Sequence, residues 1–123
     1  MKKTILLIML VFILLSSFAS AIKVNYYHYK INQDDCRLVL ESIPERYYEG
    51  ILAINQYIYP QRYAGSYMWN PSIINIYDNC SLTTLIHELA HNKNKIDGIN
   101  MFHSLNHKIG FRIAQREIWQ NLN

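Results

Sequence analysis

The stretch His87-Glu88-Leu89-Ala90-His91 decides how the rest of the chain is interpreted. On an α-helix, residues four apart lie on one face, one turn from each other, so His87 and His91 can direct two imidazole nitrogens at a single zinc ion. Glu88 would lie beside the open side of the metal, where a carboxylate can act as a general base. The pattern therefore predicts a helix that binds zinc and has a hydrolytic role.

The residues around this motif predict a helix with two separate faces. Asp78, Asn79 or Ser81 can cap its start, and we expect it to run to about Asn94. At 100° per residue, one stripe of the helix is apolar and consists of Leu82, Leu85, Ile86 and Leu89. The two histidines and the glutamate lie on the other side, so packing of the core does not require them.

A catalytic zinc ion takes three protein ligands and a water molecule, so a third ligand must come from downstream of the helix. Asp97 lies six residues after His91, as in the extended H-E-x-x-H-x-x-G-x-x-H/D pattern, with Asn94 at the position of the glycine. His103 and His107 follow, four residues apart. All three residues are candidates.

A predicted C-terminal helix favours His107 among these candidates. Ser104 can cap a helix from 105 to about 122, and its apolar residues recur at steps of three and four. The resulting stripe consists of His107, Phe111, Ala114, Ile118 and Leu122. We therefore expect His87, His91 and His107 to bind the metal, with Asp97 and His103 as the alternatives for the third ligand.

Residues 1–21 have the three parts of a secretory signal peptide. Met1-Lys2-Lys3 is charged, residues 5–18 are almost entirely apolar, and Ala19-Ser20-Ala21 is an A-x-A cleavage site. The apolar run is shorter than the ~20 residues that a membrane span needs. We expect cleavage after Ala21 and a secreted, extracellular domain of residues 22–123, although an uncleaved segment would anchor the chain to the membrane.

The composition of the secreted part restricts its partners and its size. Removal of Lys2 and Lys3 from the twelve basic residues leaves ten, against nine acidic residues. This balance predicts no nucleic-acid partner and no stable membrane association. About a hundred residues allow one domain, which we expect to be a monomer. In an exported chain, Cys36 and Cys80 are expected to form a disulfide between the region before the first helix and the start of the HELAH helix.

Three further segments complete the predicted fold. Residues 22–31 predict a strand, alone or paired with residues 36–40. A helix is expected from Ser42 to Pro60, because Ser42 and Glu45 form an S-x-x-E capping box and apolar residues follow at helical spacing. Residues 63–69 and 73–77 predict two strands joined by a turn.

These elements predict an α+β class, as a small zincin-like domain. We expect a short, mostly antiparallel sheet that packs against three helices: a covering helix, the HExxH active-site helix and a C-terminal helix. The strands that precede the active-site helix are expected to run along a cleft and to bind substrate in an extended conformation through main-chain hydrogen bonds.

The HELAHN stretch at 87–92 and the later His107-Lys108-Ile109-Gly110-Phe111 resemble the HELAHx…H-G-x-x-F pattern of the SprT-like and WLM minigluzincin metalloproteases. The resemblance spans roughly residues 42–119. It implies that the second motif opens the closing helix and that His107 is the third zinc ligand, with Phe111 four residues on. Lys108 replaces the glycine of the family pattern, and the 92–106 loop is longer than in WLM proteins. The resemblance supports the fold and the zinc chemistry, and it does not imply a DNA-linked role.

Together these features predict a small secreted zinc metallopeptidase of the HExxH type that acts as an endopeptidase, with little room for deep specificity pockets. It would hydrolyse peptide bonds of a peptide or protein substrate by a zinc-activated water, with Glu88 as general base. No tyrosine follows Tyr77, so His103 is the only downstream side chain expected to stabilise the oxyanion. The alternatives are a non-catalytic secreted zinc-binding or interaction module on the same scaffold and a disulfide-tied module without metal.

Overall fold

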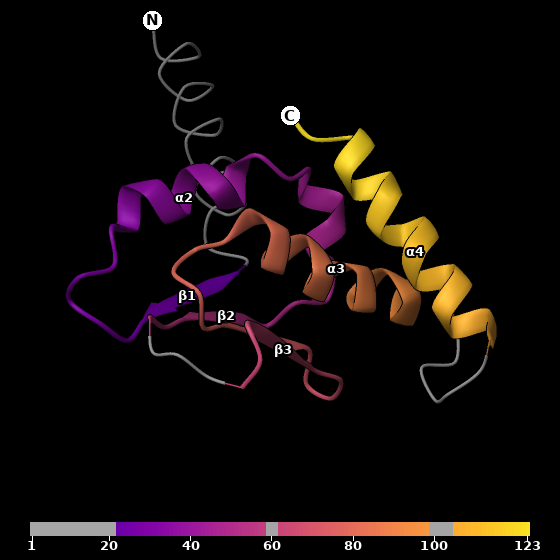
Figure 1. Ribbon diagram of the computed structural model, residues 1–123, viewed down its shortest axis with the longest axis horizontal. Coiled ribbons are helices and arrows are strands. Elements are labelled where there is room, and N and C mark those ends of the chain that lie inside the picture. The colour runs from indigo at the N-terminus through magenta and orange to yellow at the C-terminus, as the bar shows by residue number, and fades with distance from the viewer. Residues whose placement is uncertain (1–21, 59–61, 99–104) are drawn as a thin grey trace, which may run out of the picture.

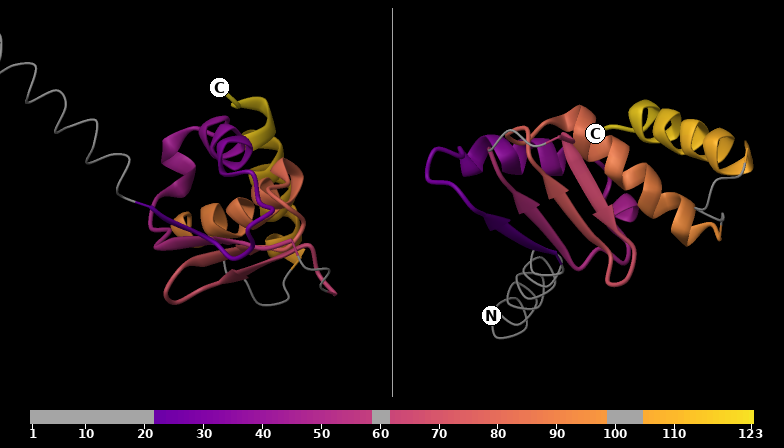
Figure 2. Two further views of the ribbon diagram at one scale, coloured as in Figure 1. Left: turned by 90° about the vertical axis from the view of Figure 1, so that its left-hand side faces the viewer. Right: turned by 60° about the horizontal axis from the view of Figure 1, so that its bottom comes forward.

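The computed structural model describes residues 22–58, 62–98 and 105–123, with the side chains of the last segment described from Lys108 onward. The predicted signal peptide, His103 and Ser104 lie outside this part of the chain. The elements follow in the order β1 (Lys23–Tyr26), α2 (Gln33–Glu41), the 3₁₀ helix η1 (Glu45–Tyr48), β2 (Ala53–Gln56), β3 (Gly65–Met68), β4 (Ile73–Ile76), α3 (Leu82–Ile96) and α4 (Leu105–Gln120). The α+β class is confirmed, and the helices cover one face of the sheet (Figures 1 and 2).

The sheet is mixed and mostly parallel, so the prediction of a mostly antiparallel sheet was wrong. Its strand order is β1-β2-β4-β3, with β1–β2 and β2–β4 parallel and β3–β4 antiparallel. Parallel neighbours require a crossover connection. Between β1 and β2 this crossover contains α2, in a stretch that the sequence pattern had partly assigned to a strand.

Residues 36–40 lie in α2 and are not a strand. Asn32 caps this helix, because its side-chain oxygen accepts a hydrogen bond from the Asp35 backbone N–H at 3.1 Å. Asp34 and Asp35 then occupy the first turn, where negative charge is favourable. The helix that covers the β1 side of the sheet is therefore α2.

The helix predicted from Ser42 to Pro60 was also wrong. Within the described part of this stretch, residues 42–58, only η1 is helical, and β2 follows it. Gly50 separates the two with a φ of 78°, a left-handed conformation that an α-helix does not accommodate. The spaced apolar residues are nevertheless buried, because η1, β2 and the loops beside them direct side chains into the core: Ile43, Tyr47, Ile51 and Ile54.

The elements next to the histidine motif match their predictions. β3 and β4 form the expected antiparallel pair, and α4 occupies nearly the expected range. Helix α3 begins after Ser81, whose side chain accepts a hydrogen bond from the Thr84 backbone N–H at 3.2 Å. The predicted disulfide between Cys36 and Cys80 is present with a Cα–Cα distance of 5.1 Å, although Cys36 lies within α2. It joins α2 to the start of α3.

The core lies between the sheet and the helices. Its fully buried members come from the sheet and from α3 and α4: Ile54, Ile74, Ile76, Leu85, Ile86, Leu89 and Ile118. Helix α4 packs against α3, at the margin of the molecule in Figure 1. In the described part of the chain, no helix is both long enough and apolar enough to span a membrane.

The outer face of the sheet carries an N-x-Y sequence in register on three parallel strands, beginning at Asn25, Asn55 and Asn75. The Asn25 amide donates to Asn55 Oδ1, and the Asn55 amide donates to Asn75 Oδ1, each at 2.9 Å. The three tyrosines stack beside this ladder, with ring centroids 4.8 and 5.3 Å apart. A slip of one residue would turn these side chains toward the core, so the ladder fixes the strand register.

Candidate functional site

His87, Glu88 and His91 face a pocket of about 260 Å³ between α3 and β3. Its lining consists of these three residues together with Gly65, Ser66 and Tyr67. The helix and the strand meet here because α3 packs on one face of the sheet, against β3 and β4 (Figure 2). The pocket thus contains the residues that the sequence pattern singled out.

The two histidine rings lie close together and are packed by a residue from α4. Their centroids are 5.3 Å apart with an interplanar angle of 76°. The Phe111 ring lies 4.7 Å from each of them, so α4 limits the positions that both rings can adopt. Burial lowers the pKa of His87, which favours the neutral imidazole that binds metal ions.

Glu88 is a buried carboxyl group without an ordinary structural role. Its side chain is 5 % exposed, and it forms no hydrogen bond or ion pair with the rest of the described chain. Burial raises its pKa to about 7. An unpaired carboxylate is costly to bury, and a carboxyl group with a perturbed pKa in a cleft is a candidate for a functional residue.

Gly65 permits the close approach of β3 to α3. A Cβ atom at this position would lie 2.6 Å from Thr84 Cγ2, 3.0 Å from the Asn75 backbone oxygen and 3.1 Å from Glu88 Oε1. Thr84 is itself held, because its hydroxyl donates to Asp78 Oδ2 at 2.7 Å. There is no room for a side chain unless the strand moves.

Substitution Gly65→Ala is therefore expected to lower the free energy of unfolding by about 1–3 kcal/mol, the usual cost of overpacking. Urea denaturation measures this change. Gly50→Ala is the comparison for backbone strain alone, because its Cβ would meet nothing within 4 Å and its left-handed backbone would cost about 1–2 kcal/mol. A free energy of unfolding of Gly65→Ala within about 0.5 kcal/mol of wild type would show that the close contact between β3 and α3 is not a stability constraint.

Tyr67 and Asn92 fix the position of β3 relative to α3. The Tyr67 hydroxyl donates to Asn92 Oδ1 at 3.0 Å, and its ring stacks against His91 with centroids 6.1 Å apart. The buried Asn92 amide also donates to the backbone oxygens of Tyr47 and Glu49, at 3.3 and 2.9 Å. One asparagine thus joins α3 to β3 and to the end of η1.

Sequence reasoning missed Tyr67 because it considered only tyrosines downstream of the motif. The available signal was the alternation of side-chain direction along β3, which places Gly65 and Tyr67 on the same face of the sheet. The Tyr67 hydroxyl is engaged by Asn92 and Ser72, so in this structure it positions the strand.

β3 is an edge strand whose other side lies open in the described sheet. The Tyr77 backbone N–H donates to the Ala64 oxygen at 2.8 Å, which makes residues 64 and 77 a hydrogen-bonded pair. Such pairs alternate along an antiparallel ladder. The N–H and C=O groups of Gly65 and Tyr67 therefore point away from β4, beside the pocket.

The candidates for a third metal ligand have different positions. Residue 107 lies in α4, one turn before Phe111, and at 100° per residue it falls on the face that carries the buried Ala114 and Ile118. The side chain of His107 is outside the described residues, as is all of His103. The described side chains alone contain no group of three or more His, Cys, Asp or Glu suited to a metal ion.

Asp97 lies apart from the pocket. It caps the C-terminus of α3 and forms an ion pair with Lys93 at 2.8 Å. Asn94 continues the helix and does not form the left-handed turn that the extended motif requires at this position. The structure therefore does not bring Asp97 to His87 and His91.

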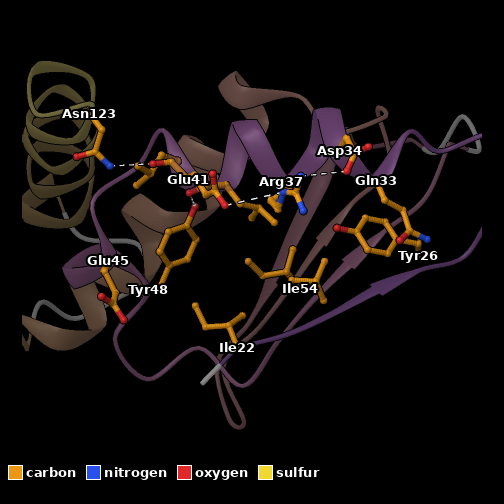
Figure 3. Close-up of a pocket in the computed structure, with 13 residues that line it drawn as sticks. Ile22, Tyr26, Gln33, Asp34, Arg37, Glu41, Glu45, Tyr48, Ile54 and Asn123 are labelled. Atoms are coloured by element: carbon orange, nitrogen blue, oxygen red, sulfur yellow. Dashed lines mark hydrogen bonds and ion pairs between the residues drawn. The ribbon is translucent and has the colours of Figure 1, made fainter. Parts of the chain in front are cut away.

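A larger cavity of about 630 Å³ lies between α2 and the inner face of β1 and β2 (Figure 3). Its floor is apolar, and its mouth carries four charged residues: Asp34, Arg37, Glu41 and Glu45. Arg37 is held by Asp34 at 3.1 Å. No histidine lines this cavity, so the smaller pocket on α3 is the better candidate for hydrolytic chemistry.

Similarity to known proteins gives no independent assignment of the site. Comparisons with protein-family models, with curated proteins and with solved structures found no match. The resemblance to the SprT-like and WLM families therefore stays a prediction from the motifs, and the functional argument rests on the geometry of the pocket.

Proposed function

We propose that this protein is a small zinc-dependent metallopeptidase in which His87, His91 and His107 hold the metal and Glu88 is the general base. The observation that carries the proposal is Glu88, a residue that is 5 % exposed and whose carboxyl group has no partner in the described chain. It shares its pocket with two histidines from the same helix. A water molecule and a cation in that pocket would compensate the carboxylate.

The residues present fit a zinc ion. Two imidazoles lie one helical turn apart with ring centroids 5.3 Å apart, and zinc prefers nitrogen ligands in catalytic sites. Position 107 is on the α4 face that packs against α3, which makes its histidine the best placed third ligand. Asp97 is engaged by Lys93, so it does not compete for this role.

Bound zinc would supply Lewis acidity toward a water molecule and toward the carbonyl group of the scissile bond. Glu88 accepts the proton that the water releases as it attacks, and it then donates this proton to the nitrogen of the leaving amine. Phe111 packs against both histidine rings and keeps their orientation. Helix α3 therefore supplies the general base and two of the three ligands.

The open edge of β3 suits a substrate in an extended conformation. The main-chain groups of Gly65 and Tyr67 point away from β4 and can hydrogen-bond to a peptide strand. Such bonds do not depend on the side chains of the substrate. We therefore expect a peptidase of low sequence specificity that acts on unfolded or extended segments.

Zinc content and peptide hydrolysis of the chain from Ile22 to Asn123 test the proposal. Wild-type protein is expected to contain zinc in equimolar amount and to cleave a casein substrate until a chelator is added. His107→Ala is expected to lose both zinc and activity, whereas Asp97→Ala and His103→Ala keep the zinc. Full zinc and full activity in His107→Ala would show that the third ligand is a different residue.

A further inference from the structure

The charged residues of this domain are segregated, although their overall numbers nearly balance. Residues 33–49 contain five acidic residues against Arg37 and Arg46. Helix α4 carries the opposite excess, with Lys108, Arg112 and Arg116 against Glu117. Figure 1 places α2 and α4 toward opposite margins of the molecule, on either side of α3. The balance of the whole sequence therefore conceals a basic surface.

The outer face of α4 combines these cations with large apolar side chains. It consists of Lys108, Ile109, Arg112, Ile113, Arg116 and Trp119, all of which are exposed. The exposed fractions of Ile109, Ile113 and Trp119 are 49 %, 63 % and 42 %. At 100° per residue, this face lies opposite Ala114 and Ile118, which are buried.

No acidic residue interrupts this face. Glu117, the one acidic residue of α4, is directed toward α3, where its carboxylate lies 3.6 Å from Lys93 Nζ. The three cations form no ion pair with a described residue. The outer face of α4 thus attracts an anionic partner and also offers it apolar side chains.

We propose that the outer face of α4 docks on an anionic phospholipid surface, with the helix lying in the plane of the interface. Anionic head groups complement the three cations, and the boundary with the acyl chains accommodates Ile109, Ile113 and Trp119. A nucleic acid would satisfy the cations but would offer no apolar phase to the two isoleucines. This proposal does not depend on the proposed peptidase activity.

The proposal departs from an expectation drawn from the sequence. Ten basic and nine acidic residues predicted no membrane partner, but electrostatic attraction extends only about 8 Å at physiological salt, so the local charge decides whether the surface binds. Each basic residue near an anionic bilayer contributes about fivefold to the partition coefficient. The binding is expected to be peripheral, reversible and sensitive to salt.

Sedimentation with vesicles tests the proposal on residues 22–123, which include every member of the described core. We expect binding to vesicles of equimolar phosphatidylcholine and phosphatidylglycerol, and none to phosphatidylcholine alone. In a Trp69→Phe background Trp119 is the sole tryptophan, and its emission is expected to shift to the blue on binding.

Paired variants separate a local surface from net charge. Arg112→Gln with Arg116→Gln is expected to weaken binding about 25-fold. Lys23→Gln with Lys30→Gln removes the same charge from exposed positions outside α4 and is expected to leave binding nearly unchanged. Ile109→Ser with Ile113→Ser keeps the charge and is expected to weaken binding to the same anionic vesicles.

Four results would overturn the proposal. The first is failure of the wild-type domain to bind the anionic vesicles, and the second is an equal loss of binding in the two charge variants. The third is retention of full binding in the isoleucine variant, which would reduce the interaction to charge alone. The fourth is stronger binding to a double-stranded DNA oligonucleotide than to the vesicles, which would assign the face to nucleic acid. Circular dichroism of each variant confirms that the helices are intact.

Discussion

Glu88→Gln is expected to reduce zinc-dependent peptide hydrolysis by a factor on the order of 10³, the usual contribution of a general base. Zinc is expected to stay bound, because the substitution leaves His87 and His91 in place. The glutamine side chain has nearly the same shape as glutamate but does not accept the proton from water. Hydrolysis of a fluorogenic peptide and metal analysis of the same preparation measure the two properties together.

Glu45→Gln is the matched control for this substitution. Glu45 is exposed and, like Glu88, forms no hydrogen bond or ion pair with the described residues. It lies at the mouth of the larger cavity, away from the pocket on α3. We expect full activity in this variant. If Glu88→Gln keeps both zinc and full activity, Glu88 is not the general base, and if it loses zinc, Glu88 has a structural role in metal binding.

The helix that carries the motif could be predicted because its signals are local. Ser81 caps it, the apolar residues repeat at helical spacing, and a turn sequence separates the two strands that precede it. These signals are independent of the rest of the chain. The predicted positions of His87, Glu88 and His91 on one helix therefore needed no tertiary information.

The segment before β2 shows why helical spacing alone was insufficient. Ile43, Tyr47, Ile51 and Ile54 recur at steps of three and four, yet they are buried from a 3₁₀ helix, a loop and a strand. The helical conformation ends after one turn, at Glu49 with a ψ of 128°, and Gly50 follows in a left-handed conformation. Short apolar runs fit both the helical and the strand period. The cap at Asn32, before α2, was the stronger local signal for a helix.

The walls of the candidate site could not be predicted, because they come from elements far apart in the sequence. Tyr67 and Gly65 reach the pocket from β3, and Phe111 reaches it from α4. Their positions depend on the strand order, which the sequence pattern did not predict. The spacing of His107 and Phe111 did anticipate that α4 would pack beside the motif.

Removal of the disulfide by Cys36→Ala with Cys80→Ala is expected to lower the free energy of unfolding by about 4 kcal/mol. The two cysteines are 44 residues apart, and the estimate follows from the chain entropy that a loop of this length removes from the unfolded state. The free energy of unfolding of a typical domain is about 5–15 kcal/mol, so this decrease is large. Urea denaturation of both proteins measures it.

The disulfide also holds the start of α3. Its removal is therefore expected to have a local effect there in addition to the general loss of stability. Asn79 and Cys80 have φ angles of 54° and 62°, a conformation that costs about 1 kcal/mol or more for residues other than glycine. Without the bond, these residues are free to relax, and the first turn of α3 is expected to exchange amide hydrogens faster. The pocket residues lie further along α3, so zinc affinity at low temperature should stay unchanged. As a control, the reduced wild type and the double variant are expected to have the same free energy of unfolding. A decrease of less than about 1 kcal/mol in the double variant, relative to the oxidised wild type, would contradict the prediction.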